Sequence, residues 1–267
     1  MSKRLANKVA FITGIGSSGP GWGTGKAIAV MFAQEGARVF GIDNNPQAAA
    51  ETQALINQAG GECTLFEGDA TSHESVRKAV EACMAAFGRI DILVNNIGIG
   101  IVGGAVDQSE EAWDRTFAIN LKSVFLTSKH CIPLMAEAGG GAIVNISSII
   151  SNRWTGVPTI AYAGSKAAMN QVTRQIAMEY APQQIRANSI LVGLINTPMM
   201  IASLSKHFGE DIPKMLSVRD QACPGGKMGD AHDIAYAAVY LASDEAKFVS
   251  GIDLVVDGGL SCQVCSL

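Results

Sequence analysis

Short apolar runs alternate with longer segments of helical periodicity along most of this chain. The apolar runs predict strands at residues 9–13, 37–42, 63–66, 90–95, 142–146, 186–191 and 252–256. The segments between them predict helices at 24–35, 46–59, 72–87, 109–136, 160–181 and 230–242. Continuous apolar strands are typical of sheets buried on both faces, and parallel neighbours need helical crossovers. The pattern therefore predicts an α/β fold, a Rossmann-type doubly wound parallel sheet of about seven strands with helices on both faces.

Length and composition fit one cooperative unit. The chain has 267 residues, 48% of them hydrophobic, and no linker or internal repeat interrupts it. We therefore expect residues 1–267 to form a single dinucleotide-binding and catalytic domain. Residues 198–226 break the alternation and are rich in large apolar side chains. We expect this segment to be an insertion that covers the substrate.

Charge and hydropathy exclude several classes of partner. The 20 basic residues are offset by 24 acidic ones, which gives a net charge of -4 and no electrostatic signature of nucleic-acid binding. No apolar run approaches the ~18 residues of a membrane span, and the first residues do not resemble a secretory signal. We expect a cytoplasmic protein that acts on small molecules, with no nucleic-acid or membrane partner.

The six cysteines are scattered, and a chain of this size does not need disulfides, so reduced thiols are expected. Cys262-Gln-Val-Cys265 matches the CxxC pattern of zinc and redox sites. Two further ligands at comparable spacing are missing from the sequence, and the pair does not open a helix. We therefore expect no metal site.

A glycine-rich loop follows the first predicted strand. Six of the 29 glycines lie between Thr13 and Lys26, at positions 14, 16, 19, 21, 23 and 25. Glycine lets the backbone approach a ligand closely, and the helix that follows supplies free amides and a positive dipole for a pyrophosphate. Strand, loop and helix in this order predict a dinucleotide site. A flexible surface loop is the alternative.

The ends of later strands indicate which dinucleotide binds. Asp43 ends the second predicted strand, 18 residues after Gly25, where a ribose-binding carboxylate is expected. This carboxylate would accept hydrogen bonds from the adenosine ribose and repel a 2′-phosphate, and Asn44 and Asn45 add no cation. We therefore expect NAD rather than NADP; an ordinary turn aspartate is the alternative. Other residues expected at the adenosine are Asp69, Ala70, Asn96 and Gly98.

A tyrosine and a lysine lie four residues apart near the start of a predicted helix, in Tyr162-Ala-Gly-Ser-Lys166. This spacing places both side chains on one helical face. An ammonium about 4 Å from the phenol contributes ~4 kcal/mol toward the phenolate at an effective dielectric of 20, which would make the tyrosine a usable base. The pattern by itself is common by chance, so its meaning depends on the other motifs.

Together these motifs resemble the short-chain dehydrogenase/reductase family from residue 8 to about residue 261. They are the glycine loop, Asn95-Asn-Ile-Gly98, Ile119-Asn-Leu121, Asn145-Ile-Ser-Ser148, Tyr162 with Lys166, and Val256-Asp-Gly-Gly259. The resemblance implies that Tyr162 is the general base in oxidation and that Ser148 hydrogen-bonds the substrate oxygen. It implies that Lys166 binds the nicotinamide ribose and that Asn120 holds a proton-relay water. A strand-end cap for Ser148 and a helix-kink role for Asn120 are the alternatives.

The resemblance also implies the cofactor site and the assembly. The cofactor residues are Gly14, Gly23, Thr24, Gly25, Asp43, Asp69, Ala70, Asn96, Gly98, Tyr162, Lys166, Ile195 and Thr197. Eight residues separate the first two of these glycines, more than the family usually has, so phosphate contacts in the elongated loop stay open. The longer loop is similar to the enoyl-reductase branch, whereas the tyrosine–lysine spacing is that of alcohol dehydrogenases. The family implies a homotetramer that packs through the helices at 109–136 and 160–181.

The predicted function is NAD-dependent interconversion of a secondary alcohol, hydrophobic or cyclic, and its ketone. We expect Met199 and Met200 at the substrate beside Ser148. Arg153 and Trp154 are further candidates, the arginine for an anionic group on the substrate; a solvated surface arginine is the alternative. Two other functions stay open. A 3-oxoacyl-thioester reductase would use NADPH, which the carboxylate after the second strand disfavours, and a catalytically silent dinucleotide-binding protein would not need the intact catalytic set.

Overall fold

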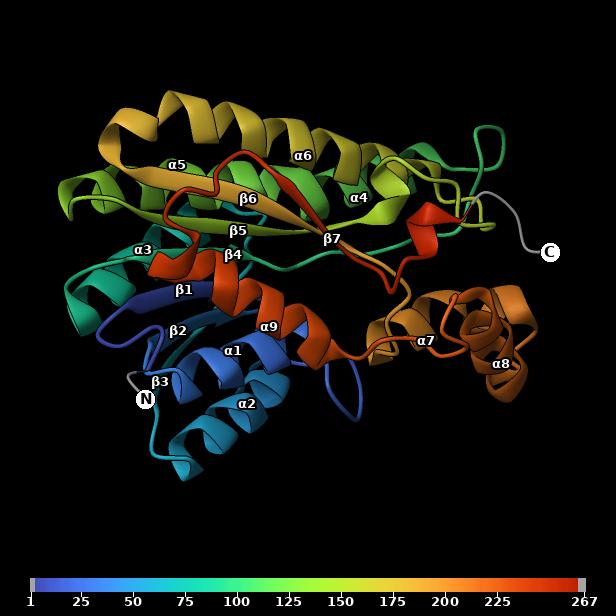
Figure 1. The fold of residues 1–267 in the computed structure, drawn as a ribbon, viewed down its shortest axis with the longest axis horizontal. Helices are drawn as coiled ribbons and strands as arrows, with labels where there is room; N and C mark the ends of the chain where they lie inside the picture. Colours follow the sequence, from blue (N-terminus) through green and yellow to red (C-terminus); the bar gives the residue numbers. More distant parts are fainter. Residues whose placement is uncertain (1–2, 264–267) are drawn as a thin grey trace.

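The structure, a computed structural model, describes residues 3–263. Its centre is a seven-stranded sheet whose neighbouring strands are all parallel, in the order β3-β2-β1-β4-β5-β6-β7 (Figure 1). The strands are β1 (Val9–Thr13), β2 (Arg38–Asp43), β3 (Glu62–Glu67), β4 (Ile92–Asn95), β5 (Gly141–Ser148), β6 (Ile185–Val192) and β7 (Asp253–Val256). The predicted doubly wound sheet is confirmed. The strand order reverses between β1 and β4, which is the switch point where such sheets bind ligands.

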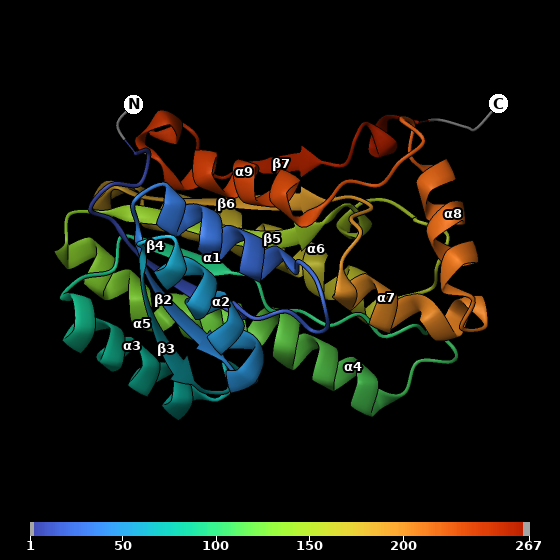
Figure 2. The ribbon, with the colours of Figure 1, turned by 90° about the horizontal axis from the view of Figure 1, so that it is seen from below.

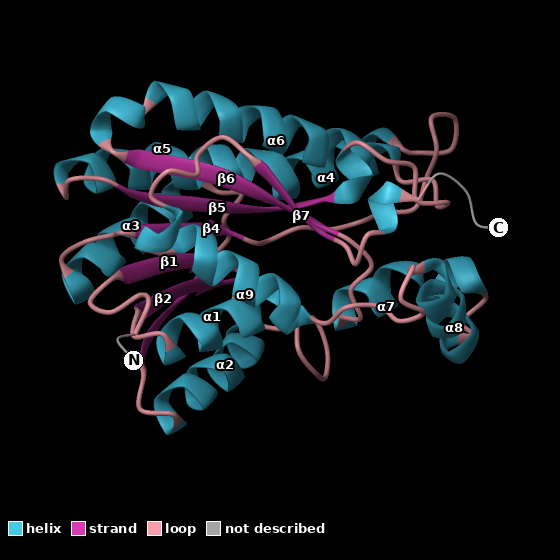
Figure 3. Ribbon diagram, viewed as in Figure 1, coloured by secondary structure: helices cyan, strands magenta, loops and turns pink. Residues whose placement is uncertain are grey.

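Helices cover both faces of the sheet (Figure 3). One layer contains α1 (Thr24–Gln34), α2 (Pro46–Gln58) and α9 (Ala231–Ala242), and the other contains α3 (His73–Phe87), α4 (Glu110–Phe117), α5 (Ser123–Glu137) and α6 (Ile160–Glu179). Along β1, Ala10 and Ile12 pack under the first layer, whereas Val9 and Phe11 pack under the second. Both faces of the strand are therefore buried, which explains why its sequence is continuously apolar.

The helix predicted at 109–136 is interrupted by a π-helical segment, η1 (Ala118–Lys122), between α4 and α5. The buried Asn120 side chain lies in this segment. Its amide donates to the Ile99 carbonyl and to the Ser165 hydroxyl, both at 3.0 Å, and its oxygen accepts from the Ile99 N–H at 2.8 Å. The bonds of Asn120 to these two neighbouring segments account for the wider, π-helical turn at this position. Such π-helical turns often occur at functional sites.

The segment expected as an insertion forms α7 (Pro198–Leu204) and α8 (Ile212–Ala222). Figures 1 and 2 show both helices beyond one end of the sheet, outside the two helical layers. Their apolar side chains gather in a small core of their own, built from Met200, Met215, Cys223 and Met228. Because α7 follows directly after β6, the segment overhangs the carboxyl ends of the strands.

Two sequence expectations concern membranes and metals. Within residues 3–263, no helix is long and apolar enough to cross a membrane. The same residues contain no group of three or more His, Cys, Asp or Glu side chains that could hold a metal ion. Cys262 is exposed, and Cys265, its partner in the CxxC pattern, lies outside the described residues.

Candidate active site

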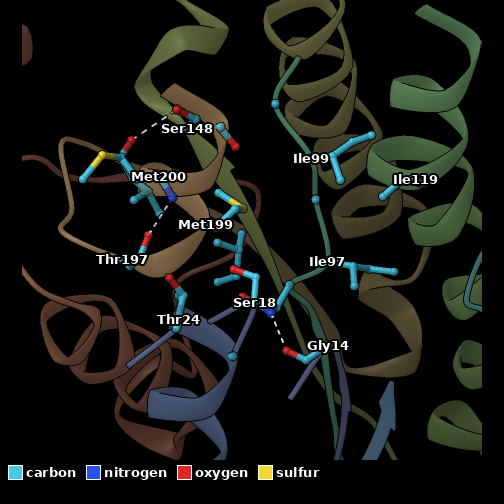
Figure 4. Close-up of a pocket in the computed structure, with 18 of the residues that line it drawn as sticks. Gly14, Ser18, Thr24, Ile97, Ile99, Ile119, Ser148, Thr197, Met199 and Met200 are labelled. Carbon is cyan, nitrogen blue, oxygen red and sulfur yellow. Dashed lines mark hydrogen bonds between the residues drawn. The ribbon is translucent and has the colours of Figure 1, made fainter. Parts of the chain in front are cut away.

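A cavity of about 690 Å³ lies where the carboxyl ends of the strands meet α7 (Figure 4). Its volume is in the range of small-molecule and cofactor sites. The residues predicted to bind the cofactor all line it: Gly14, Gly23, Thr24, Gly25, Asp43, Asp69, Ala70, Asn96, Gly98, Tyr162, Lys166, Ile195 and Thr197. These residues come from segments far apart in the sequence, and the parallel sheet brings them to one edge.

The glycine loop packs tightly between β1 and α1. Gly14 has a φ of 69°, and a Cβ added to Gly25 would lie 1.9 Å from the Gly14 carbonyl oxygen. The Asn96 side chain donates to the same carbonyl at 2.8 Å. Any larger residue at position 25 would push the loop away from the helix start. Backbone amides therefore reach the cavity at the N-terminus of α1, an arrangement that fits the pyrophosphate of a dinucleotide.

The extra residues of the loop extend toward the insertion and toward α9. The Trp22 ring lies against the His232 ring, with 4.7 Å between their centroids. A Cβ on Gly19 would lie 3.3 Å from Pro198, the first residue of α7. Ser18, on the same stretch, lines the cavity (Figure 4). The elongated loop is therefore packed against two helices and forms part of the cavity wall.

Asp43 ends β2 on the cavity wall. Its carboxylate accepts hydrogen bonds from the N–H groups of Gly16 and Asn45, both at 2.9 Å. These bonds fix the carboxylate against the glycine loop and leave further lone pairs for a ribose. Among the described residues, the part of the wall that follows β2 and β3 contains no lysine or arginine. A negative charge without a neighbouring cation therefore marks this end of the cavity.

Tyr162 and Lys166 lie one turn apart on α6, and both line the cavity. Lys166 is 3% exposed, and its Nζ lies 5.7 Å from the centre of the Tyr162 ring. The ammonium donates to the Ile146 carbonyl at 2.7 Å. A Cβ added to Gly98 would lie 3.4 Å from the same Nζ. The backbone at Gly98 therefore passes directly beside the lysine, where a side chain would crowd it.

Two serines end β5, and their hydroxyls have different partners. Ser148 donates to the Val192 carbonyl at 3.3 Å and lies on the cavity wall (Figure 4). The Ser147 hydroxyl is buried and donates to the backbone carbonyl of Lys166 at 3.4 Å. A hydrogen bond between Ser148 and the Tyr162 phenol opposes the larger rise in the Tyr162 pKa that burial causes. Ser148 is thus the serine next to the tyrosine, as the sequence predicts.

Burial dominates the proton affinities at this site. It raises the pKa of Tyr162, an effect that the Ser148 hydroxyl partly offsets. Burial also lowers the pKa of Lys166 to about 7. The sequence-based expectation that the lysine lowers the tyrosine pKa is not supported by this geometry. The physical reason is that burial lowers the pKa of Lys166 to about 7, so its amine is largely neutral at the pH where the phenol titrates, and burial also disfavours the phenolate itself.

We expect Lys166→Met to stabilise the fold, with a gain that shrinks as the pH rises. The folded pKa of about 7 lies below the ordinary value of 10.5, so unfolding takes up a proton between these values and wild-type stability increases with pH. The unfolding midpoint should rise by about 5 °C at pH 6 and by little at pH 10. Thermal unfolding at both pH values measures this. The exposed Lys247→Met is the control, and a gain independent of pH would contradict the prediction.

The remaining residues predicted from the sequence divide into two groups. Met199 and Met200 line the cavity, as expected (Figure 4). Asn120 does not, because its side chain is directed to Ile99 and Ser165.

Arg153 and Trp154 also lie outside the cavity lining, which corrects their expected placement at the substrate. The guanidinium of Arg153 donates to the carbonyls of Asn152 and Ser261, at 3.0 and 3.4 Å, and the Trp154 side chain is 74% exposed. The bond to the Ser261 carbonyl holds Arg153 outside the cavity, and the Trp154 side chain is largely in solvent.

Two arginines that the sequence did not single out line the cavity: Arg115 on α4 and Arg219 on α8. Each lies on a helix that carries other charged residues, a pattern that usually indicates a solvated side chain. Only the packing of the insertion around its own apolar core shows that Arg219 faces the cavity. An apolar part of the cavity wall was also not predicted from the sequence; it consists of Ile97, Ile99 and Ile119 (Figure 4).

Comparisons with known proteins agree with this geometry. Residues 19–261 match a family model described as enoyl-(acyl carrier protein) reductase. A 2,5-dichloro-2,5-cyclohexadiene-1,4-diol dehydrogenase of Sphingobium indicum is 39% identical over 264 residues, which are 99% of this chain and 100% of that one. A cyclohexanol dehydrogenase of Acinetobacter is 35% identical over 98% of each chain. The structure of a short-chain dehydrogenase/reductase from Burkholderia xenovorans matches with a TM-score of 0.92 and 44% identity, over 99% and 100% of the two chains. This chain belongs to the short-chain dehydrogenase/reductase family.

Membership in the short-chain dehydrogenase/reductase family confirms three predictions: the family, the Rossmann-type fold and an oxidoreductase that interconverts CH–OH and C=O groups. Dehydrogenases of this family use nicotinamide cofactors. The glycine loop, the α1 N-terminus and Asp43 fit such a cofactor, because they offer close backbone approach, amide donors and a ribose acceptor at one edge of the sheet.

Proposed function

We propose that this short-chain dehydrogenase/reductase oxidises a hydrophobic or cyclic secondary alcohol to its ketone with NAD, and reduces the ketone in the reverse direction. The observation that carries the proposal is that Ser148, Tyr162 and Lys166 line the same cavity as the predicted cofactor set. The cyclic alcohols in the names of two relatives support the substrate class. The four-residue spacing of Tyr162 and Lys166 favours alcohol chemistry over the enoyl reduction in the family model's description.

The proposed reaction converts alcohol and NAD⁺ to ketone, NADH and a proton. When bound, the nicotinamide accepts the carbinol hydride. Ser148 hydrogen-bonds the substrate oxygen and holds it near the Tyr162 phenol, which takes the hydroxyl proton in oxidation and returns it in reduction. Because burial raises the pKa of Tyr162, the phenol is a proton donor in the free protein, and a positive charge beside it is needed before it can act as a base.

Lys166 and Asn120 have supporting roles in this proposal. Lys166 keeps its hydrogen bond to the Ile146 carbonyl and presents its remaining donors to the nicotinamide ribose beside Gly98. Asn120 is a positioning residue, because its side chain fixes the strand-end loop at Ile99. We propose no direct contact between the Asn120 side chain and a ligand.

Three wider features complete the proposal. The Asp43 carboxylate, with no cation on the adjoining wall among the described residues, supports NAD over NADP. Helices α7 and α8 cover the substrate as an insertion within one catalytic domain. The protein assembles as a homotetramer through α5 and α6, which expose Phe125 and Met178 at 57% and 64%. Light scattering after size exclusion measures the assembly.

A substrate panel tests the reaction. Purified protein is offered cyclohexanol, cyclohexane-1,2-diol and 2-octanol with NAD⁺ or NADP⁺, and reduced nicotinamide is followed by absorbance. We expect oxidation of the cyclic alcohols with NAD⁺. Reduction of an acetoacetyl thioester with NADPH, without alcohol oxidation, would favour the 3-oxoacyl-thioester reductase. Cofactor binding without turnover of any substrate would favour the silent dinucleotide-binding protein.

The two serines at the end of β5 provide a matched pair of variants. Ser148→Ala should lower kcat about 100-fold, because it removes a hydroxyl that stabilises the reacting oxygen. Ser147→Ala should keep kcat within about fivefold, since the Ser147 hydroxyl donates to the Lys166 backbone, and should lower the unfolding midpoint instead. Steady-state kinetics and thermal unfolding of both variants measure this. The opposite order of the two kcat values would assign the role to Ser147.

A further inference from the structure

The Arg219 guanidinium has no partner for its charge among the described residues. Arg219 projects from α8 and lines the cavity. Its Nε is buried without a hydrogen-bond partner, and the guanidinium takes part in no ion pair within residues 3–263. Burial lowers the pKa of Arg219, and only the Cys223 thiol opposes this shift. A half-buried guanidinium with no ion-pair partner is unfavourable unless a ligand supplies the missing negative charge.

Neighbouring carboxylates do not neutralise this charge. Asp220, the next residue on α8, accepts a hydrogen bond from the Met228 N–H at 2.8 Å. Among the described lining residues, the acidic ones are Asp43, which ends β2, and Asp69, which follows β3; both lie at the end of the cavity proposed for the adenosine. The part of the cavity beneath the insertion therefore has a positive charge and no negative one.

Several apolar side chains of the insertion lie in or under the wall of the cavity that Arg219 lines. Met215, one turn before it, is fully buried, and Met200 and Leu204 of α7 line the same cavity. In such an environment a guanidinium binds a planar oxyanion with paired, charge-assisted hydrogen bonds. Arg115 also lines the cavity, but its side chain is exposed, so water screens its charge. Arg219 is thus the better placed of the two for recognition.

We propose that the substrate is a secondary alcohol, or its ketone, with an apolar body that carries a carboxylate, and that Arg219 binds this carboxylate. The proposal rests on the proposed function, because it places the carbinol at Ser148 and Tyr162 and the carboxylate under α8 in the same cavity. It moves the anion recognition that the sequence suggested for Arg153 to a residue that lines the cavity.

The test compares two substrates that differ in charge and hardly in shape, 3-hydroxycyclohexanecarboxylate and 3-hydroxycyclohexanecarboxamide. The measured quantity is the ratio of their kcat/KM values with NAD⁺. We expect Arg219→Gln to lower the ratio about 30-fold, mainly through the KM of the carboxylate. Arg219→Lys should keep part of the preference, since it keeps the charge and loses the fork of donors. Arg153→Gln, which removes the arginine outside the cavity, should leave the ratio within twofold.

Two results would overturn the proposal: equal ratios in wild type and Arg219→Gln, or an equal fall in Arg153→Gln. Failure of the proposed function is a separate outcome, in which wild type oxidises neither substrate. Calorimetric titration of the same carboxylate into wild type and Arg219→Gln, with NADH present, then decides the question. Binding by wild type that weakens at least tenfold in the variant supports the proposal, and absent or equal binding refutes it. Unfolding midpoints show that each variant is folded.

Discussion

Tyr162→Phe should lower kcat for alcohol oxidation about 10³-fold while the Kd for NADH changes less than threefold. The substitution removes one hydroxyl from the cavity wall and leaves the ring beside Lys166 in place. Proton transfer by a positioned group contributes roughly 10²–10⁴ to a rate, and the cavity wall offers no second phenol among the described lining residues. A nearby water is a poorer base without a fixed position.

Tyr236→Phe is the matched control, because that tyrosine is 63% exposed on α9 and does not line the cavity. It should leave both kcat and the Kd within twofold. Single-turnover absorbance of reduced nicotinamide and fluorescence titration of NADH separate turnover from binding. Undiminished turnover in Tyr162→Phe would eliminate the phenol as the proton-transfer group. This conclusion would hold for whichever alcohol of the substrate panel the enzyme oxidises.

The sheet was predictable because strands that are buried on both faces consist of continuous runs of apolar residues, which can be recognised in the sequence. The strand predicted at 9–13 is β1, Val9–Thr13, and the others differ by a few residues at their ends. Strand ends were harder to place because pairing extends beyond the apolar run. At β5, register with β6 continues to Ser148, so two polar serines belong to the strand. Both serines lie at the edge of the cavity. Because they are polar, they do not extend the apolar pattern from which the strand was predicted.

Parts of the fold that depend on tertiary contacts were not predictable from periodicity. The π-helical segment around Asn120 follows from hydrogen bonds to Ile99 and Ser165, neither of them near it in sequence. The inward orientation of Arg219 depends on how α8 packs through Met215 and Cys223. The outward orientation of Arg153 likewise depends on the Ser261 carbonyl. An arginine that faces a cavity and an arginine that faces solvent look the same in the local sequence. The sequence pattern therefore could not show which of the two arginines lines the cavity.

Local sequence patterns predicted only part of the candidate site. The family resemblance was needed to bring together residues that lie far apart in the sequence. Strand, glycine loop and helix indicate a dinucleotide site on physical grounds alone. The pairing of Tyr162 with Ser148, by contrast, joins a helix to a strand end and came from the resemblance. The pKa shifts of Tyr162 and Lys166 needed the structure, since burial, and for Tyr162 also the Ser148 hydroxyl, set them. Sequence thus predicted most of the residues that line the cavity, whereas the electrostatics of the cavity depend on its three-dimensional packing.

Asp43→Ala should reduce the preference for NAD over NADP about 10³-fold. A carboxylate about 4 Å from a 2′-phosphate charge costs ~4 kcal/mol at an effective dielectric of 20, close to a thousandfold in binding. Removing it relieves that repulsion and also deletes a charged acceptor for the ribose hydroxyls, so NAD binding weakens as NADP binding improves. The ratio of kcat/KM for the two cofactors, with one saturating alcohol, measures the change.

Two further variants separate charge from loop structure. Asp43→Ala/Asn44→Arg should turn the preference to NADP, because a guanidinium at the exposed position 44 can pair with the 2′-phosphate. Asp69→Asn is the control, since a residue at the adenine meets a part that both cofactors share and should weaken both equally. The Asp43 carboxylate also holds the Gly16 and Asn45 amides, so loop disorder alone would weaken both cofactors in Asp43→Ala. An unchanged ratio with both affinities reduced would therefore assign Asp43 to loop support and remove it as the determinant of cofactor choice.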